Sequence, residues 1–317
     1  MNFEEFFNKN KEFVLLTPIL VVFFLFFIFS INSSNLNDKK IDQNFSGEKE
    51  SIIEKPKVDY ESVLKNIKAK SFCVYDFKKD EIVFSKNENL QLPLASITKL
   101  MSGFVVMDIL PESTIVEIKT KDILEEGDSG LVVGENWKLK DLLDFSLITS
   151  SNDGMHAISS VLNNYKSSDG KNTIILMNER AKEIGLVNTV FMNETGLDID
   201  KNLSGAYSSA YDVSLLLKKI LKENISLISD TTKDIDSFVS ESNITHVASN
   251  TNISINNIPN ILLSKTGYTD LAGGNLAIVF DAGFSYPVSV VVLGSTIEER
   301  FSDVEKLVNL TLQKLSE

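Results

Sequence analysis

The chain has 317 residues, of which 43% are hydrophobic, so it can bury one large core or two small ones. Its formal net charge of -13 argues against a nucleic-acid partner, because phosphate binding needs a basic surface. One cysteine, Cys73, excludes an intramolecular disulfide, and two histidines are too few for a histidine-based zinc site, so we expect no metal or other cofactor.

The N-terminal part of the chain differs in composition from the rest. Residues 13–31 form an uncharged apolar run close to the ~20 residues that span a bilayer. We expect a transmembrane anchor here rather than a cleaved signal peptide, because no alanine-containing cleavage site follows. Residues 1–12 are then a short N-terminal segment, residues 32–57 a flexible polar linker, and residues 58–317 the folded domain.

Apolar periodicity in the folded domain predicts strands at both ends and helices between them. The predicted strands are residues 71–77, 81–86, 260–269, 275–283 and 286–296. The predicted helices are 96–109, 139–148, three that begin near Asp153, Thr173 and Ala210, and 302–315. This order favours an α+β domain: an antiparallel sheet built from distant segments, flanked by helices, facing a helical subdomain across a cleft.

A serine and a lysine three residues apart, Ser96 and Lys99, share one face of the predicted helix. A nucleophile and its base need this spacing. The same spacing elsewhere in the chain lies in polar surroundings, whereas the residues around Ser96 are apolar. Burial disfavours the charged form of Lys99, so its amine can take the serine proton.

Two further motifs complete a set. Ser150 and Asn152 lie at a corner between two predicted helices, where both side chains can reach one cleft, although such a pair alone is common in helix caps. Lys265 and Thr266 lie on an apolar strand and can hold a carboxylate, while Gly267 allows a ligand to approach the backbone. Together the three motifs form the signature of class A β-lactamases and penicillin-binding proteins.

The segments around these motifs resemble the D-alanyl-D-alanine carboxypeptidases, the S11 serine peptidases among low-molecular-weight penicillin-binding proteins. The similar segments are LPLASITKLM, VGENWKLKDLLDFSLITSSNDG, GLVNTVFMNETGLD and SKTGYTDLAGGNLAIV. The resemblance covers residues 71–317 and implies a β-lactamase/penicillin-binding-protein-like fold. It also implies a serine carboxypeptidase that trims D-Ala-D-Ala ends of peptidoglycan stem peptides during cell-wall biogenesis, with β-lactams as covalent inhibitors.

By this resemblance, Ser96 attacks the carbonyl between the two terminal D-alanines, releases D-alanine and leaves an acyl-enzyme that water hydrolyses. Lys99 is then the base, Ser150 relays a proton to the leaving amine, and Asn152 holds the peptide carbonyl of the substrate. The chemistry also places the domain outside the bacterial cytoplasmic membrane. The single apolar helix is expected to hold it there through contact with the lipid bilayer, with residues 1–12 in the cytoplasm.

The resemblance also assigns the residues that bind the substrate's terminal carboxylate, which are Lys265 and Thr266 next to Gly267. Lys265 is expected in addition to lower the pKa of Lys99. The oxyanion hole is expected to consist of the backbone N–H groups of Ser96 and Tyr268.

Three alternatives remain open: a D,D-endopeptidase with the same residues, a class A-like β-lactamase, and a non-catalytic module that binds peptidoglycan or senses β-lactams. A β-lactamase needs a carboxylate that activates water, and Glu194 is its candidate, although its surroundings resemble the carboxypeptidase segment. Ser151 stands where many family members have glycine, and Gly154 where many have alanine. The N-terminal anchor is expected to replace the C-terminal membrane helix that some members carry.

Overall fold

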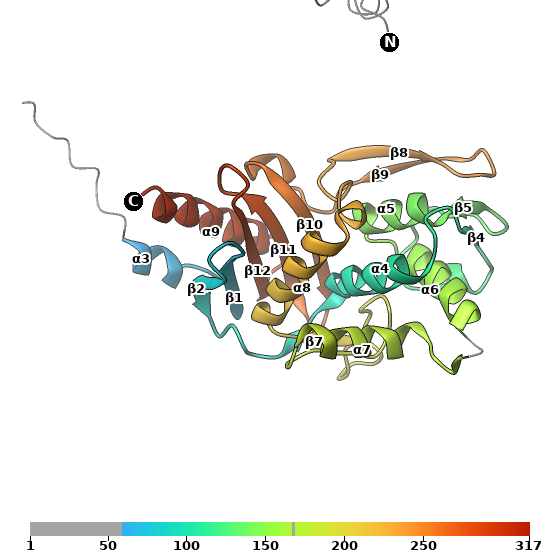
Figure 1. Ribbon diagram of the computed structural model, residues 1–317, viewed down its shortest axis with the longest axis horizontal. Coiled ribbons are helices and arrows are strands. Elements are labelled where there is room, and N and C mark those ends of the chain that lie inside the picture. The colour runs from blue at the N-terminus through green and yellow to red at the C-terminus, as the bar shows by residue number, and fades with distance from the viewer. Residues whose placement is uncertain (1–58, 167–168) are drawn as a thin grey trace, which may run out of the picture. The chain divides into compact units, whose positions relative to one another are not determined.

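The computed structural model describes residues 59–166 and 169–317 (Figure 1). The expected N-terminal segment 1–12, transmembrane anchor 13–31 and linker 32–57 lie outside these residues and stay predictions. Within the described part of the chain, no helix is long and apolar enough to cross a membrane.

A five-stranded antiparallel sheet forms the centre of the domain, in the order β10-β11-β12-β1-β2. Its strands are β1 (Ser71–Asp76), β2 (Glu81–Lys86), β10 (Ile261–Thr269), β11 (Gly273–Asp281) and β12 (Pro287–Ser295). The first strand pairs with the last, so that Val74 lies opposite Val290. The prediction of one sheet assembled from distant segments is therefore confirmed. β10 is an edge strand.

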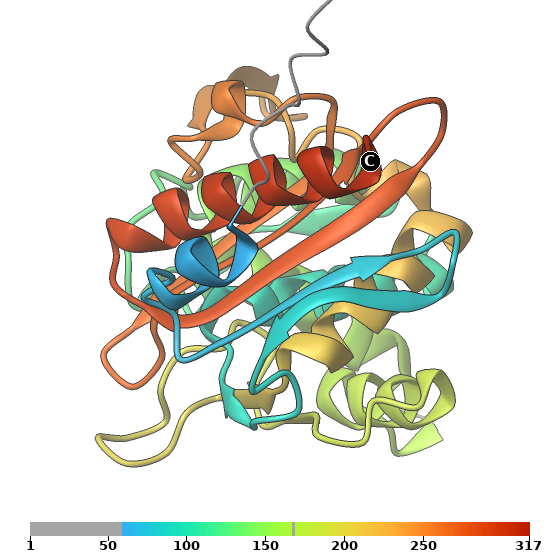
Figure 2. The same ribbon diagram turned by 90° about the vertical axis from the view of Figure 1, so that its left-hand side faces the viewer.

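Helices cover both faces of this sheet, which is why its inner strands are apolar on both sides. The short helix α3 (Tyr60–Lys65) and the long helix α9 (Glu299–Leu315) lie over one face (Figure 2), and α8 (Ala210–Glu223) lies over the other. Successive side chains of β12 point to opposite faces of the sheet: Val290 packs in the core with α9, and Val291 packs in the core with α8. Cys73 is buried in the α8 core, and burial raises the pKa of its thiol to about 12.

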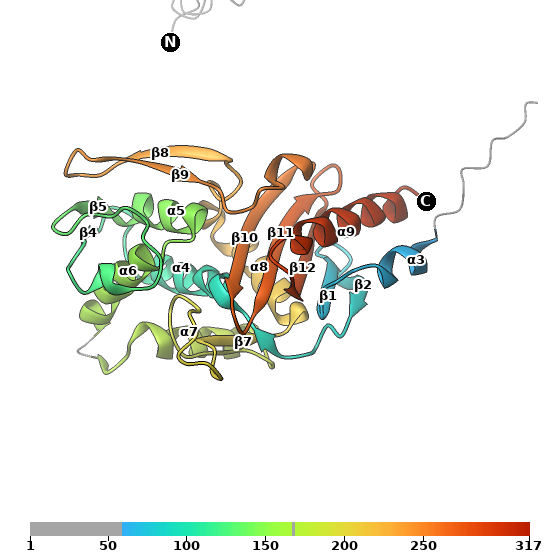
Figure 3. The ribbon, with the colours of Figure 1, turned by 180° about the vertical axis from the view of Figure 1, so that it is seen from behind.

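A helical subdomain adjoins the β10 edge of the sheet, as the view from behind shows (Figure 3). Its helices are α4 (Thr98–Ile109), α5 (Leu139–Thr149), α6 (Asn152–Lys166) and α7 (Thr173–Ile184). α4 lies at its centre, contacts the other three, and is buried over its first nine residues because its sequence is apolar on most sides. The 3-10 turn η1 (Ala95–Ile97) precedes α4 and contacts β10, so the start of α4 meets the sheet edge.

Several short elements were not predicted. They are the pair β4 (Ile115–Glu117) and β5 (Asn136–Lys138), the sheet of β3 (Leu92–Pro93), β7 (Ala206–Ser208) and β6 (Val190–Phe191), the hairpin of β8 (Ile235–Val239) and β9 (Thr245–Ser249), and the turns η2 (Asp122–Leu124), η4 (Ile225–Leu227) and η5 (Ile255–Asn257). The β8–β9 hairpin runs along α5 (Figure 1). There His246 Nε2 lies 2.7 Å from Glu135 Oε1, and both side chains are buried.

Candidate active site

Ser96 lies in the η1 turn, one short turn before the α-helix that the sequence predicted to begin there. Two glycines press against this turn. A Cβ atom added to Gly196 would lie 1.9 Å from the carbonyl oxygen of Ala95, and one added to Gly267 would lie 2.8 Å from that of Leu94. Gly267 was expected to let a ligand approach the backbone. In the structure, Gly267 lets β10 itself approach the η1 turn that carries Ser96.

The Lys99 amine is buried between three oxygen atoms. Its Nζ lies 2.8 Å from Ser96 Oγ, 2.6 Å from Asn152 Oδ1 and 3.0 Å from the carbonyl oxygen of Thr195. The amide oxygen of Asn152 and the carbonyl oxygen of Thr195 can only accept hydrogen bonds, so each binds one hydrogen of the amine. A neutral amine held in this way directs its lone pair at the hydroxyl of Ser96. The geometry therefore suits proton transfer from Ser96 to Lys99.

Burial lowers the pKa of Lys99 to about 7, against the opposing charges of Glu194 and Glu125. The prediction that burial lowers this pKa is therefore confirmed. The further effect expected from the charge of Lys265 is not among the causes at Lys99. The coupling between the two lysines appears at Lys265 instead. Burial lowers the pKa of Lys265 well below its ordinary value, and the charge of Lys99 lowers it further.

Lys265 and Ser150 form a second hydroxyl–amine pair in the cleft. Lys265 Nζ donates hydrogen bonds to Ser150 Oγ at 2.9 Å and to the carbonyl oxygen of Thr266 at 3.0 Å. Ser150 terminates α5 with a φ of +64°, a left-handed conformation that turns its side chain towards β10. Asn152, at the start of α6, faces Lys99 and donates from Nδ2 to the carbonyl oxygen of Glu126 at 2.5 Å. The three motifs thus converge on one site.

The two departures from the family pattern have structural reasons. Ser151 Oγ accepts a hydrogen bond from Gly154 N at 3.0 Å, capping α6, and lies 2.7 Å from Ser129 Oγ. Gly154 has no room for a methyl group, since an added Cβ would lie 2.1 Å from Ser146 Oγ. Ser146 on α5 therefore fills the space of the alanine methyl group at this position.

The structure brings three residues to the site that motif reasoning missed. Arg300 on α9 is buried and donates from Nη1 to the carbonyl oxygen of Gly267 at 2.9 Å. Thr251 Oγ1 lies 2.6 Å from Thr266 Oγ1. Asn275 on β11 is fully buried behind the nucleophile turn. An arginine on the apolar face of a helix was the one available signal in the sequence.

Tyr268 and Glu194 lie at the edges of the site. Tyr268 follows Gly267 on β10, with its side chain exposed. The Glu194 carboxylate contacts His156, with 2.7 Å between Glu194 Oε1 and His156 Nδ1, and its carbonyl oxygen accepts a hydrogen bond from Ser102 Oγ. Its carboxylate is therefore engaged away from Ser96, which does not favour the β-lactamase alternative.

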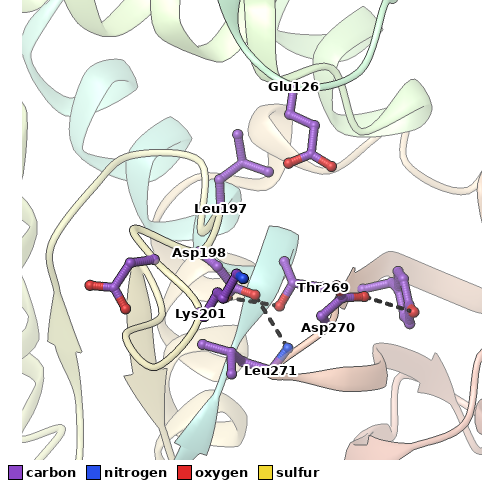
Figure 4. A pocket seen from close by; sticks show the side chains of 9 residues that line it. Glu126, Leu197, Asp198, Lys201, Thr269, Asp270 and Leu271 are labelled. Carbon is purple, nitrogen blue, oxygen red and sulfur yellow. Dashed lines mark hydrogen bonds between the residues drawn. The ribbon is translucent and has the colours of Figure 1, made fainter.

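Tyr268 also lines a cavity of about 610 Å³, and Figure 4 shows other side chains that line it. Asp198 shapes its floor by accepting hydrogen bonds from Thr269 Oγ1 at 3.0 Å and from Leu271 N at 3.2 Å. Its lining residues are Glu126, Leu197, Asp198, Asp200, Lys201, Tyr268, Thr269, Asp270 and Leu271. The lining holds four acidic side chains and one basic one, so the cavity is suited to a cationic group.

A second cavity, of about 330 Å³, is lined by Ser150 and Asn152. Its wall includes Val247 and Ser249 from the β8–β9 hairpin. The hairpin therefore contributes to the surroundings of Ser150 and Asn152.

Comparison with known proteins bears on both fold and family. The chain is 31% identical over 253 residues to the D-alanyl-D-alanine carboxypeptidase DacF of Bacillus subtilis, covering 78% of this chain and 62% of that protein. It is 34% identical over 230 residues to a D-alanyl-D-alanine endopeptidase of Pseudomonas aeruginosa, covering 70% of each. The chain thus spans less than two thirds of the B. subtilis relative.

Solved structures show the same penicillin-binding-protein-like α+β fold. A D-alanyl-D-alanine carboxypeptidase from Mycobacterium tuberculosis superimposes with a TM-score of 0.68 at 19% identity, covering 77% of this chain and 91% of that one. Penicillin-binding protein D2 from Listeria monocytogenes, in an ampicillin-bound form, gives a TM-score of 0.64 at 23% identity, covering 77% and 97%. Residues 57–296 match the family model described as D-alanyl-D-alanine carboxypeptidase, so the chain belongs to this family, peptidase family S11.

Proposed function

We propose that the protein is a serine-type D-Ala-D-Ala carboxypeptidase that trims peptidoglycan stem peptides through an acyl-enzyme on Ser96. One observation carries the proposal: the buried Lys99 amine, with a pKa lowered to about 7, lies 2.8 Å from Ser96 Oγ. A serine hydroxyl is a weak nucleophile until an adjacent base takes its proton.

In acylation, Lys99 takes the Ser96 proton while Oγ attacks the carbonyl carbon of the scissile bond. The negative oxygen that forms is stabilised by the backbone N–H groups of Ser96 and Tyr268. As the carbon–nitrogen bond breaks, Ser150, which is hydrogen-bonded to Lys265, gives its proton to the leaving D-alanine nitrogen and takes one from Lys99, so Lys99 is neutral again. In deacylation, Lys99 takes a proton from water while the water oxygen attacks the ester carbonyl. Lys99 then returns this proton to Ser96 Oγ as the ester bond breaks.

The position of β10 determines how the peptide lies. β10 is an edge strand, so the stem peptide can add to it as a further strand. The terminal carboxylate is held by Lys265 and Thr266, and Asn152 holds the peptide carbonyl. The residues before the scissile bond then run past Tyr268 into the larger cavity, whose acidic lining suits an amine-bearing residue at the third position.

A D,D-endopeptidase is the second candidate, because the smaller cavity beside Ser150 offers space on the leaving-group side. A carboxypeptidase releases only D-alanine there, whereas an endopeptidase cleaves a cross-link and releases the second stem peptide. Two matched relatives carry the endopeptidase name, at 34% and 28% identity. The cleavage products distinguish the two activities.

We further propose that β-lactams acylate Ser96 and that residues 13–31 anchor the protein in the cytoplasmic membrane, with residues 58–317 outside. The support is the family membership, the bilayer-length apolar run and the extracytoplasmic location of peptidoglycan. Protease digestion of intact cells tests the orientation, since only an external domain is degraded.

The experiment for the main proposal treats the full-length protein, in detergent, with a fluorescent penicillin and with a diacyl-Lys-D-Ala-D-Ala peptide. Wild type should be labelled covalently and should release D-alanine, and Ser96→Ala should do neither. Covalent labelling without release of D-alanine, together with cleavage of cross-linked peptides, would identify an endopeptidase. An unlabelled wild type would refute Ser96 as the nucleophile.

A further inference from the structure

His156 lies next to the base but has no part in the reaction described above. It is one helical turn after Asn152 on α6, so both side chains project from the same face of the helix. Asn152 reaches Lys99, and His156 reaches the segment that follows β6: its Nδ1 lies 2.7 Å from Glu194 Oε1. The side chain of Glu194 is only 14% exposed, so little solvent screens this pair.

The main chain of the same segment contacts α4. The carbonyl oxygen of Glu194 accepts a hydrogen bond from Ser102 Oγ at 2.6 Å. The next carbonyl, that of Thr195, accepts one from Lys99 Nζ at 3.0 Å. Glu194 is thus held by its side chain on α6 and by its main chain on α4, and Thr195 is placed against the base.

His156 is surrounded by carboxylates. Besides Glu194, Glu125 Oε1 lies 3.6 Å from Nδ1, and the buried Asp122, from η2, has Oδ1 3.8 Å from Nε2. The neighbouring cation Lys121 is turned to Ser160 instead. The hydrogen bond with Glu194 raises the pKa of His156, with burial opposing it and the three carboxylate charges adding to it.

Glu194 and Glu125 are also the two charges that oppose the loss of charge on Lys99. We propose that His156 is a positioning residue for Lys99, holding Glu194 so that the Thr195 carbonyl stays against Nζ and screening the Glu194 carboxylate from that amine. The inference rests on the proposed function, in which Lys99 acts as the base. It adds a histidine–glutamate pair that keeps this base neutral.

The test is the pH dependence of acylation of the full-length protein by a fluorescent penicillin. The neutral amine of Lys99 is the reactive form, so the rate constant falls on the acid side with a midpoint set by its pKa. His156→Gln keeps a hydrogen-bond donor but removes the charge. It should move this midpoint upward by roughly 0.5 to 1 pH unit, the size of losing one nearby, partly screened charge.

Glu194→Gln removes the opposing charge and should move the midpoint downward, while the double variant should lie between the two. His246→Gln is the matched control, because His246 Nε2 makes the same 2.7 Å contact to a glutamate, Glu135, and neither residue is among the charges that act on Lys99. It should leave the midpoint unchanged. If His156→Gln and Glu194→Gln lower the rate equally at every pH with the midpoint fixed, the inference is wrong. A wild type that is not labelled would refute the proposed function itself.

Discussion

The side-chain amide of Asn275 donates a hydrogen bond to the main-chain carbonyl of Leu94 at 3.0 Å. The same amide donates to the carbonyl of Pro93 at 2.9 Å, and its oxygen accepts from Gly294 N at 2.8 Å. Two central strands, β11 and β12, are thus tied to the turn that presents Ser96. The nucleophile is positioned by the sheet as well as by its own helix.

Removing this tie should cost both stability and activity. Asn275→Ala leaves the buried carbonyl of Leu94 without its partner, together with the partly buried Pro93 carbonyl and Gly294 N–H, and an unsatisfied buried group costs about 1–3 kcal/mol. Chemical denaturation should show a loss of unfolding free energy of this order, and penicillin labelling should slow. Asn202→Ala, at an exposed asparagine, is the control. Equal behaviour of the two variants would show that the tie is unimportant.

The pKa of Lys99 predicts how acylation depends on pH. Its folded-state pKa of about 7 means that the neutral, proton-accepting fraction grows as pH rises through 7. The acylation rate should therefore fall about tenfold per pH unit well below that value, because one proton is involved. A rate that stays level from pH 7 downward would contradict Lys99 as the base.

Replacing Lys99 tests the same role by another route. Lys99→Met keeps the length of the side chain without its amine, and loss of a general base typically costs about 10²–10⁴-fold in rate. Lys65→Met is the matched control, because Lys65 has the same spacing from Ser62 but lies exposed on α3. Stopped-flow measurement should show slow penicillin labelling for Lys99→Met and a wild-type rate for Lys65→Met. Equal labelling rates would refute Lys99 as the base.

The contact between α5 and α6 predicts a coupled pair of substitutions. Gly154→Ala places a methyl group against Ser146 Oγ and should destabilise the fold, since overpacking a core typically costs about 1–3 kcal/mol. Adding Ser146→Ala removes the obstructing oxygen and should recover most of this loss in thermal unfolding. Additive effects in the double-mutant cycle would mean that the two positions do not compete for space.

The acidic cavity predicts a substrate preference. Peptides with a free amine on the third residue should bind better than the same peptides acetylated there, mainly through KM. Replacing Asp200 and Asp270 by asparagine should reduce this preference roughly 2- to 30-fold, since exposed ion pairs contribute about 0.2–1 kcal/mol each. Glu81→Gln, on the distant strand β2, serves as the control. If the KM ratio between the acetylated and the free-amine peptide is unchanged in the double variant, the third residue does not bind in this cavity.

Much of this architecture was predictable because its signals are local. Strand and helix periodicity located the sheet and the large helices, and motif spacing located Ser96, Lys99 and Lys265. Arg300, Asn275 and the β8–β9 hairpin were not predictable in this way. They reach the site through contacts between distant elements. Apart from the arginine on the apolar face of α9, the local sequence around each is that of an ordinary helix, strand or turn.

Electrostatics was the other limit of the sequence. The apolar surroundings of Lys99 predicted that burial lowers its pKa, and burial is the cause that the structure gives. The added effect predicted for the charge of Lys265 was wrong, because the charges that act on Lys99 depend on the fold. The His156–Glu194 contact was likewise invisible, because helix α6 and the loop after β6 meet only in three dimensions.

The pairing of β1 with β12 has a consequence for how the protein matures. Ser71 lies opposite Leu293, and the Lys265 strand depends on β11 and β12 for its place in the sheet. Contacts between such distant residues form late and slow folding, because a long loop must close first. A nascent chain can therefore form α4 and the turn that carries Ser96 well before the strand of Lys265 is in place, so the candidate site is completed late in folding.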